Sequence, residues 1–571
     1  MDYFREPGVK NNMSVRPEAF IEQAEYLDRQ SFLDWGADHP DESTIIRKLT
    51  QGGAKLISGP RGCGKTTLML KAYNKLLSDN VALPVYVNFK RSLSIEPLYV
   101  SGDRGTYHFN QWILLKVYEG LYQSLAEIQN SIELSIPRSE AASRIAALEF
   151  SNYAGLPELD LTIDWLETDI LRVLEKCGRS RCVLLLDDAA HAFSPEQQRD
   201  FFDFFRQIKT REISPKAAIY PGVTSYSSSF HVGHDAEEID VWVKPERPGY
   251  LQFMRRVIEG RFPSDALDVL YRDKKVVDFL CYSAFGIPRA FLNILQSLLD
   301  SADDDEGGFT GLKRRQVLAE VKEHYQNTLK LFRSLNDKVP TYRNFIENGE
   351  LVFGVGVDLI KEYNKNKPVA KQSVSIAINV ADMSQELARL FSLFQYAGLC
   401  ISKGVVSRGE KGRFEIFSVH YSALVNANAL LGRKAVNIDD YVEAFSSRDA
   451  HEFTRVSPQA LMNGRSVGEL FELSLPPCSV CGAPRINKDA KFCANCGSKL
   501  TASSTYKQLI SRDISALPLT ESRVAKIKAQ SSIRQVKDIL LDKEHKQLRS
   551  VERVGPFWAE RIVRLAEEFV E

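Results

Sequence analysis

Apolar residues follow two kinds of pattern along the chain. Short apolar runs with polar ends occur at 54–58, 83–89, 181–188 and 217–225. Such runs are typical of strands buried on both faces of a parallel sheet that is covered by helices. Helical spacing or helix-start signals occur at 17–29, 42–50, 107–128 and 158–176, and again from Ser194. The pattern therefore predicts a parallel α/β fold in which strands and helices alternate.

A glycine-rich loop lies between the first predicted strand and the next helix. Residues 59–66 read GPRGCGKT and match G-x-x-x-x-G-K-[ST] at every position. The glycines let successive N–H groups point at a β-phosphate, and the helix N-terminus adds partial positive charge. We expect Lys65 to reach the β- and γ-phosphates and Thr66 to ligate Mg²⁺. The predicted nucleotide-binding residues are Gly59, Pro60, Arg61, Gly62, Cys63, Gly64, Lys65, Thr66 and Thr67. The alternative is a chance glycine-rich turn, against which the order strand, loop, helix argues.

Two adjacent carboxylates end the third predicted strand. Asp187 and Asp188 close the apolar run that begins at residue 181. We expect Asp187 to hold the Mg²⁺ shell beside Thr66, and Asp188 to polarise the attacking water. The alternative is a buried strand whose polar end merely caps the next turn. The phosphate loop ahead of this strand favours the catalytic interpretation.

Composition excludes several classes of protein. The 571 residues are 44% apolar and 26% charged, with a formal net charge of zero, so no global field indicates a polyanion partner. The length suggests several domains. There is no apolar stretch near the roughly 18 residues of a membrane span, and the N-terminus does not resemble a signal peptide. Nine cysteines, four of them clustered, do not resemble a secreted disulfide frame. We therefore expect a cytoplasmic protein that does not enter a membrane.

Two further positions complete a set of motifs that resembles a known family. Thr224 lies at the end of the run 217–225, and Arg289 opens a predicted helix directly after Gly-Ile-Pro. With the loop 59–66 and the strand 183–188, they make residues 30–300 similar to an AAA+ ATPase of the origin-recognition-complex type, a clade bordering the STAND switches. The resemblance implies ATP and Mg²⁺ as cofactors, Thr224 as a γ-phosphate sensor and Arg289 as a second sensor on a helical lid. The alternative for Arg289 is a solvated helix N-terminus, which disfavours a cation slightly. The implied catalytic residues are Lys65, Asp187, Asp188, Thr224 and Arg289.

The sequence departs from the family pattern in two respects. The second acidic residue is usually Glu, whereas this chain has Asp188, whose shorter side chain predicts slow hydrolysis. The family also takes an arginine finger from a neighbouring subunit, which implies a homo-oligomer. Arg206, Arg211 and Arg247 are candidates for this finger, and each is otherwise a surface residue.

A basic hairpin predicts a winged-helix-like domain after the lid. The helical pattern 385–397 leads into strands at 399–402 and 413–419, which flank the glycine-rich segment 403–412. The basic residues of this wing are Lys403, Arg408, Lys411 and Arg413. They are placed either to follow a phosphate backbone or to contact a protein, and the pattern does not choose between the two.

Four cysteines form two C-x-x-C-Gly knuckles. Cys478 and Cys481 are separated by eleven residues from Cys493 and Cys496. Two such knuckles complete a tetrahedral S₄ site, so the spacing predicts Zn²⁺ in a zinc ribbon, whereas redox dithiols are the alternative. The metal would be structural because so short a segment cannot build a core.

The C-terminal segment is basic. From residue 478 onward there are 17 Lys and Arg against 11 Asp and Glu, a local excess of six positive charges. The stretch 548–562 resembles a helix-hairpin-helix, in which a turn at Gly555 would present amides to DNA, although Arg553 stands where the first glycine is usual. The segment also resembles the paired hairpins at the C-terminus of the RNA polymerase alpha subunit. A helical protein-docking module is the alternative; the charge favours nucleic acid.

The predicted organisation follows from these segments. We expect an N-terminal segment and AAA+ P-loop core at 1–245, a helical lid and acidic linker at 246–308, and a winged-helix-like domain at 309–450. A zinc ribbon at 474–500 and a small all-α, helix-hairpin-helix-like domain at 505–571 follow.

Three classes of function fit this organisation. The leading prediction is an oligomeric, DNA-associated AAA+ ATPase. The second is a STAND-like prokaryotic antiviral defence ATPase, whose tail recognises a protein trigger or recruits a separate effector protein. The third is a nucleotide-binding scaffold with negligible turnover.

Overall fold

The computed structural model describes most of the chain from residue 17 to residue 570. The residues outside the description are 1–16, 102–103, 151–158, 189–193, 304–310, 431–436, 447–451, 479, 486, 488–489, 491, 501–503, 553 and 571. Most of the predicted acidic linker and Arg553 fall among them.

The core is a parallel sheet, as the apolar runs predict. Its strands are β1 (Lys55–Ser58), β2 (Ala82–Asn88), β3 (Arg181–Asp187), β4 (Ile213–Ile219) and β5 (Glu237–Asp240). Within the described residues the order is β2-β3-β4-β1-β5, and every pairing is parallel. Strand β4 lies between β1 and β3, and β5 lies on the other side of β1. This is the arrangement of an AAA+ P-loop core.

Helices cover both faces of this sheet. They are α1 (Arg29–Trp35), α2 (Glu42–Thr50), α3 (Lys65–Asp79), α4 (Glu96–Ser101), α5 (Gly105–Glu127), α6 (Arg138–Glu149), α7 (Ile163–Cys177) and α8 (Pro195–Gln207). Val183 and Leu185 of β3 pack with α2 and α3, whereas Leu184 and Leu186 pack with α5, α7 and α8. Both faces of β3 are therefore buried, which explains its unbroken apolar sequence.

Two sequence expectations are corrected here. Residues 17–29 form two 3₁₀ turns, η1 (Pro17–Phe20) and η2 (Ala24–Tyr26), instead of one helix, and α1 begins only after Asp28 caps it. Strand β4 ends at Ile219, not at residue 225. Pro221 and Gly222, which has a φ of 80°, end the strand in a turn.

A helical lid and a winged-helix-like domain follow. The lid helices are α9 (Tyr250–Glu259), α10 (Ser264–Leu270), α11 (Lys274–Ser283) and α12 (Pro288–Asp303). The next elements are α13 (Arg314–Lys338), α14 (Arg343–Asn364), β6 (Ser375–Asn379), α15 (Gln385–Tyr396), β7 (Cys400–Ser407), β8 (Arg413–Val419), α16 (Tyr421–Asn426), α17 (Ile438–Ser446) and β9 (Thr454–Arg455). Their described strands pair in the order β7-β8-β6-β9. Helix α15, β7, the wing and β8 therefore follow one another as predicted.

The winged-helix-like domain is joined to both the lid and the core. Its buried residues belong to the same apolar cluster as those of α9, α11 and α12. Arg389 of α15 donates a hydrogen bond of 2.6 Å to the carbonyl of Gly222 in the core. A Cβ at Gly222 would lie 2.2 Å from the carbonyl oxygen of Ser392, so the two backbones meet at a position that only glycine allows.

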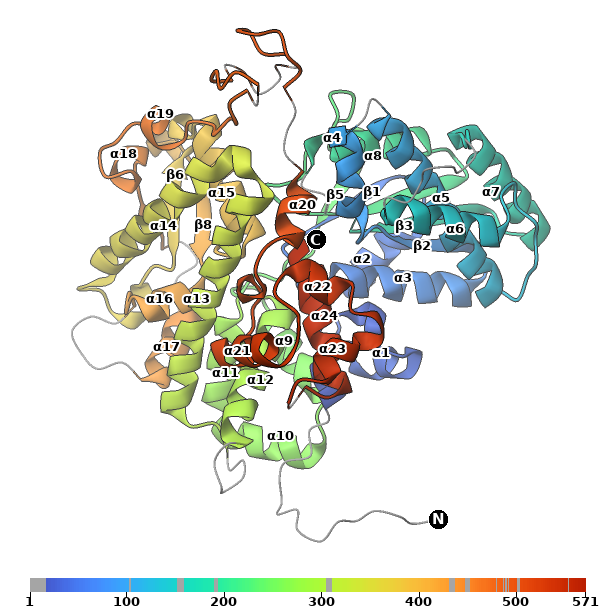
Figure 1. The fold of residues 1–571 in the computed structure, drawn as a ribbon. Coiled ribbons are helices and arrows are strands. Elements are labelled where there is room, and N and C mark those ends of the chain that lie inside the picture. Colours follow the sequence, from blue (N-terminus) through green and yellow to red (C-terminus); the bar gives the residue numbers. More distant parts are fainter. Residues whose placement is uncertain are drawn as a thin grey trace.

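The remaining helices form a small C-terminal domain that packs between the larger units. Two short helices, α18 (Pro458–Leu461) and α19 (Val467–Leu470), precede the cysteine knuckles. The domain itself contains α20 (Thr505–Ile510), α21 (Glu521–Gln530), α22 (Val536–Leu540), α23 (Lys546–Arg549) and α24 (Pro556–Val570), around an apolar core of its own. Figure 1 shows these helices in red between the core and the winged-helix-like domain, with the C-terminus near the centre of the view. No helix in the described part of the chain has the length and apolarity to cross a membrane.

Candidate nucleotide site

The phosphate loop has the geometry that its sequence predicts. Gly62 and Gly64 have φ angles of 80° and 101°, in the left-handed region that favours glycine, and α3 begins at Lys65. The Lys65 amino group is buried and donates to the carbonyls of Gly59 (2.7 Å) and Pro60 (3.0 Å). Burial lowers the pKa of Lys65 from its ordinary value. The amino group is thus held at the loop, where phosphate oxygens would bring compensating charge.

Asp187 lies beside Thr66 at the end of β3. Its carboxylate is fully buried and accepts hydrogen bonds from the Tyr86 hydroxyl (2.9 Å) and from Thr66. Burial, reinforced by the charges of Asp188 and Glu25, raises the pKa of Asp187 to about 7. A hydroxyl and a carboxylate are hard oxygen ligands of the kind that Mg²⁺ prefers, so this pair fits the predicted cation.

Asp188 is held in place by a tyrosine that the motifs did not identify. Its backbone is left-handed, with a φ of 51°, and its carboxylate accepts a hydrogen bond of 2.7 Å from the Tyr220 hydroxyl. The Tyr220 ring also lies under the Lys65 amino group, 3.7 Å from the ring centroid. Tyr220 directly follows β4, and its place at the end of the strand beside β3 is the sequence signal that could have indicated it.

The structure does not bring Thr224 to the cavity. Its hydroxyl donates to the Tyr220 carbonyl at 2.8 Å and accepts from the Tyr220 amide at 3.2 Å. The reason is the early end of β4, since the residues after Ile219 form a turn. Tyr220 contacts the cavity in its place.

Arg289 joins the lid to the phosphate loop. It lies in the first turn of α12, and its amide donates to the Gly62 carbonyl at 3.4 Å. A Cβ added at Gly62 would lie 2.7 Å from the Cβ of Arg289, so the contact is close. The guanidinium forms ion pairs with Glu568 (3.4 Å) and Glu22 (3.5 Å). The predicted sensor arginine therefore faces the site together with two acidic residues that sequence reasoning missed.

One cavity contains most of these groups. Its charged and polar lining includes Glu22, Glu25, Arg61, Lys65, Thr66, Lys90, Asp188, Tyr220 and Arg289. Its apolar lining includes Phe32, Trp35, Leu68, Phe253 and Val257. A cavity lined by both apolar and charged side chains suits a nucleotide, whose base is flat and whose phosphates are anionic. Among the predicted residues, Lys65, Thr66, Asp188 and Arg289 line this cavity. Asp187 does not line it, but its carboxylate accepts a hydrogen bond from Thr66.

The finger candidates Arg206, Arg211 and Arg247 lie elsewhere on the core. All three are exposed, and Arg247 is paired with Asp41. No neighbouring subunit is part of the structure, so their role stays a prediction.

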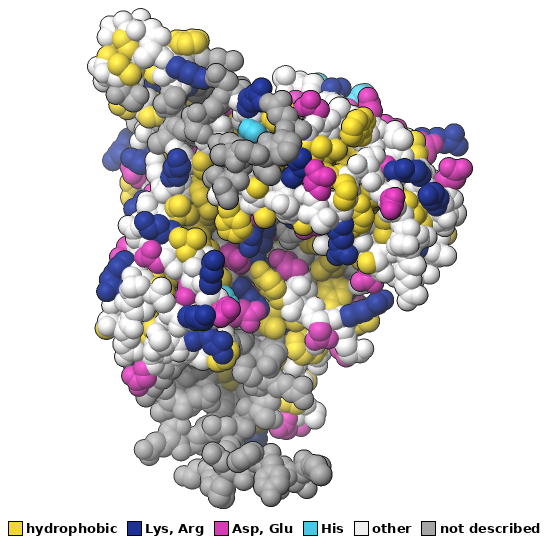
Figure 2. Space-filling model, turned by 45° about the vertical axis from the view of Figure 1, so that its right-hand side comes forward, with side chains coloured by type: hydrophobic (Ala, Val, Ile, Leu, Met, Phe, Trp, Pro, Cys, Tyr) yellow, Lys and Arg dark blue, Asp and Glu magenta, His cyan; other side chains and the backbone are white. Residues whose placement is uncertain are grey.

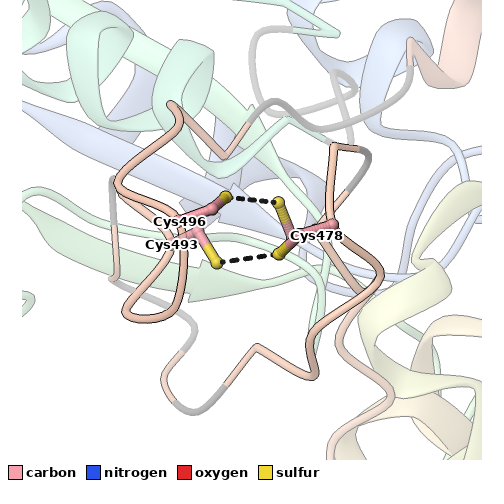
Figure 3. A group of neighbouring side chains, drawn as sticks. Cys478, Cys493 and Cys496 are labelled. Carbon is pink, nitrogen blue, oxygen red and sulfur yellow. Dashed lines mark hydrogen bonds between the residues drawn. The ribbon is translucent and has the colours of Figure 1, made fainter.

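The four cysteines of the knuckles converge (Figure 3). Their sulfur atoms all lie within 4.8 Å of one another, with Cys478 and Cys496 at 3.7 Å and Cys481 and Cys493 at 3.6 Å. A tetrahedral Zn²⁺ with bonds of about 2.3 Å needs sulfurs about 3.8 Å apart. Gly482 and Gly497 have φ angles of 71° and 69°, as the turn of each knuckle requires. The cluster therefore fits the zinc ribbon.

The wing and the C-terminal domain expose fewer cations than their sequences contain. In the wing, Lys403 pairs with Glu246 of the core at 2.8 Å and Arg408 lies over Phe453, whereas Lys411 and Arg413 are exposed. In the C-terminal domain the exposed cations include Arg534, Lys537, Lys543, Lys546 and Arg549. Figure 2 shows acidic and basic side chains interspersed over one face of the molecule, without a continuous basic surface.

The expected role of Gly555 is not supported by its geometry. Its φ is not in the left-handed region, and a Cβ there would meet no atom within 4 Å. The turn before α24 therefore does not require glycine.

Comparisons with known proteins agree with the type of fold but add no detail. No family model matches the sequence, and no curated protein matches it. A Walker-type ATPase of Pyrococcus abyssi is 13% identical, with a TM-score of 0.36 over 69% of this chain and 96% of that one. The ORC2 protein of Aeropyrum pernix is 11% identical (TM-score 0.33, 73% and 96%), and its ORC1 protein in complex with DNA is 16% identical (0.29, 71% and 96%).

The strand order, the phosphate loop and the acidic strand end define a P-loop NTPase core of the AAA+ type. A cysteine cluster that fits a zinc ribbon and an all-α domain follow towards the C-terminus.

Proposed function

We propose that this protein is a DNA-associated ATPase whose nucleotide state controls its assembly. The observation that carries the proposal is the cavity in which Lys65, Thr66 and Asp188 meet Arg289 of the lid. Such a site can sense a triphosphate, because its groups come from both the core and the lid.

Each residue has a role in this proposal. Lys65 and Arg289 bind the phosphates, and Thr66 and Asp187 hold Mg²⁺, which neutralises charge on the β- and γ-phosphates. Asp188 orients the attacking water, and the Tyr220 hydroxyl fixes the carboxylate of Asp188. The apolar end of the cavity receives the adenine ring. Because Asp188 is shorter than the usual Glu, turnover is slow.

An arginine from a neighbouring subunit would complete the transition-state charge. Arg206, Arg211 and Arg247 are exposed, and Arg247 would have to leave its ion pair with Asp41 to make this contact. We expect ATP to promote a larger particle than ADP, measured by light scattering. A particle of constant size under all nucleotides would contradict the in-trans part of the proposal.

Exposed cations of the wing and the C-terminal domain are the proposed DNA contacts. We expect K411A/R413A and K537A/K543A each to weaken DNA binding several-fold, and to reduce the salt dependence by about one unit of slope for each lost phosphate contact. Lys528→Ala is the matched control, since Lys528 already pairs with Asp513 at 2.7 Å.

The decisive experiment is steady-state ATP hydrolysis by the full chain, with and without duplex DNA. Turnover that DNA increases supports the proposal. Turnover that is absent under both conditions, although ATP binds, would instead leave a nucleotide-binding scaffold.

A further inference from the structure

The last described helix ends against two arginines, Arg61 and Arg289, that line the nucleotide cavity. Glu568, three residues from the C-terminus, forms an ion pair of 3.4 Å with Arg289, and its carboxylate also accepts a hydrogen bond from Gln23. Its backbone carbonyl accepts a hydrogen bond of 3.1 Å from the Arg61 guanidinium of the phosphate loop. The end of α24 therefore engages both the loop arginine and the lid arginine.

The surroundings of Glu568 are strongly cationic. Its side chain is only 19% exposed. Burial opposes ionisation, yet Arg289, Arg61 and Lys90 together hold the pKa of Glu568 at about 2. Glu22, which faces the same arginine, behaves in the opposite way, because burial raises its pKa and Glu568 adds to that effect. Of these two carboxylates, only Glu568 has a pKa that the neighbouring cations lower below its ordinary value.

Further contacts bind α24 to the core and the lid. Arg561 donates a hydrogen bond of 2.5 Å to Gln296 of α12, and Arg564 lies over Tyr26, 4.2 Å from the ring centroid. At the other end of the domain, Glu96 accepts hydrogen bonds from the backbone amide of Thr505 (2.9 Å) and from the hydroxyl of Ser504. The domain is also attached through Arg512, which pairs with Asp337 of α13, and of these attachments only the one made by α24 involves residues that line the nucleotide cavity.

We propose that Glu568 is a tethered competitor for the γ-phosphate, so that a nucleoside triphosphate releases the end of α24 and a diphosphate does not. This inference rests on the proposed nucleotide site and adds its regulation. A γ-phosphate and a carboxylate are both anions that guanidinium groups bind through paired hydrogen bonds. The two cannot share Arg289 at once, because like charges at such short range repel each other.

The donors of Arg289 are consistent with this exchange. Its buried Nε lies 3.5 Å from a Glu22 carboxylate oxygen but makes no hydrogen bond within the described residues. An anion with three terminal oxygens can offer this donor a hydrogen bond that neither Glu22 nor Glu568, which approaches Nη1, provides. A diphosphate has no γ-phosphate and leaves the Glu568–Arg289 pair in place.

Release of α24 would also change what the C-terminal domain presents. Arg561 would leave Gln296 and Glu22, which now hold it against the lid and the N-terminal segment. Its charge would then become available on the surface of the domain. The binding surface of the C-terminal domain would in this way depend on the nucleotide.

The test compares Glu568→Gln with Glu567→Gln in the full chain. Glu567 is the neighbouring acid and lies 3.9 Å from Arg91, outside the Arg61–Arg289 cluster. We expect E568Q to bind the slowly hydrolysed analogue ATPγS about tenfold more tightly than the wild type, while ADP affinity changes less than about twofold. E567Q should match the wild type for both nucleotides. Titration with a fluorescent nucleotide as the displaced probe measures all six affinities.

Hydrogen exchange of α24 in the wild type provides a measurement that needs no variant. ATPγS should increase exchange across 556–570, whereas ADP should leave it unchanged. The proposed competition between Glu568 and the γ-phosphate would be overturned if E568Q bound ATPγS no more tightly than E567Q. Equal exchange of α24 with both nucleotides would overturn it as well. If neither wild type nor E568Q binds any nucleotide, the proposed nucleotide site itself is wrong.

Discussion

On the two sides of the nucleotide cavity, the pKa values of carboxyl groups are shifted in opposite directions. On the side of β3, burial and the neighbouring Asp188 and Glu25 raise the pKa of Asp187 to about 7. On the side of the lid, cations overcome burial and hold the pKa of Glu568 at about 2. Because both groups are buried, burial cannot explain the difference; the neighbouring charges do.

This difference indicates what each side lacks. The acidic side would gain from a divalent cation, and the cationic side would gain from an anion. A triphosphate with Mg²⁺ supplies both at once, whereas on the lid side the chain itself supplies anions, because Glu22 and Glu568 pair with Arg289. The lid arginine therefore already has anionic partners.

The largest effect is expected where the two sides meet. Lys65→Ala should lower triphosphate affinity more than about 100-fold, because the phosphates lose a buried cation partner. Lys75→Ala, on the exposed part of the same helix, is the matched control. Calorimetric titration measures both. Binding by K65A within about threefold of the wild type would place the phosphates elsewhere.

A second effect belongs to the acidic side alone. Asp188→Asn should keep triphosphate affinity within about threefold and lower turnover about 100-fold, because the attacking water loses its base. Tyr220→Phe should lower turnover about tenfold, since Asp188 loses the hydroxyl that fixes it. Asp268→Asn, an exposed lid residue, controls for the loss of one charge. Turnover of D188N equal to that of D268N would remove Asp188 from the chemistry.

Acid should loosen the lid side through Glu568. A carboxyl group whose pKa is depressed on folding stabilises the folded state above its ordinary value of 4.5, and that stability is lost as the pH falls toward about 2. We therefore expect protection factors of α24 to fall between about pH 5 and pH 2. Other carboxylates titrate in the same range, so E568Q is the reference. An identical fall in E568Q would contradict the assignment.

The smallest effect on the cavity should come from the zinc ribbon. Chelation should remove one Zn²⁺ per chain, measured by atomic emission, and unfold the knuckles around Cys478 and Cys493. Nucleotide affinity should change less than about twofold, because no ribbon residue lines the cavity among those described. A large loss of affinity would show that the ribbon supports the site after all.

Sequence reasoning succeeded where the chemistry lies in one continuous segment. The phosphate loop, the pair Asp187–Asp188 and the cysteine knuckles each depend on local spacing, which the chain displays directly. The strand at 217–225 was predicted too long because Pro221 and Gly222 turn the backbone earlier than the apolar pattern suggests.

The rest of the site depends on contacts between distant segments. Glu22, Tyr220, Arg289 and Glu568 meet only after the core, lid and C-terminal domain have packed, and a single glutamate at the end of a helix gives no local signal. The charge count predicted a basic DNA-binding tail. In the structure, however, Arg561 donates to Gln296 of the lid and Arg564 lies over Tyr26. Composition counts charges but does not show which of them are already paired.

Gly222 lies in a turn that connects the catalytic site with the winged-helix-like domain. It lies two residues after Tyr220, which holds Asp188, and its backbone touches Ser392 and Arg389 of the winged-helix-like domain. The turn at Gly222 therefore contacts the winged-helix-like domain on one side and leads to the residue that holds Asp188 on the other. A side chain at position 222 would clash with Ser392 and separate the two backbones. We therefore expect the close contact at Gly222 to link the position of that domain to the position of Asp188.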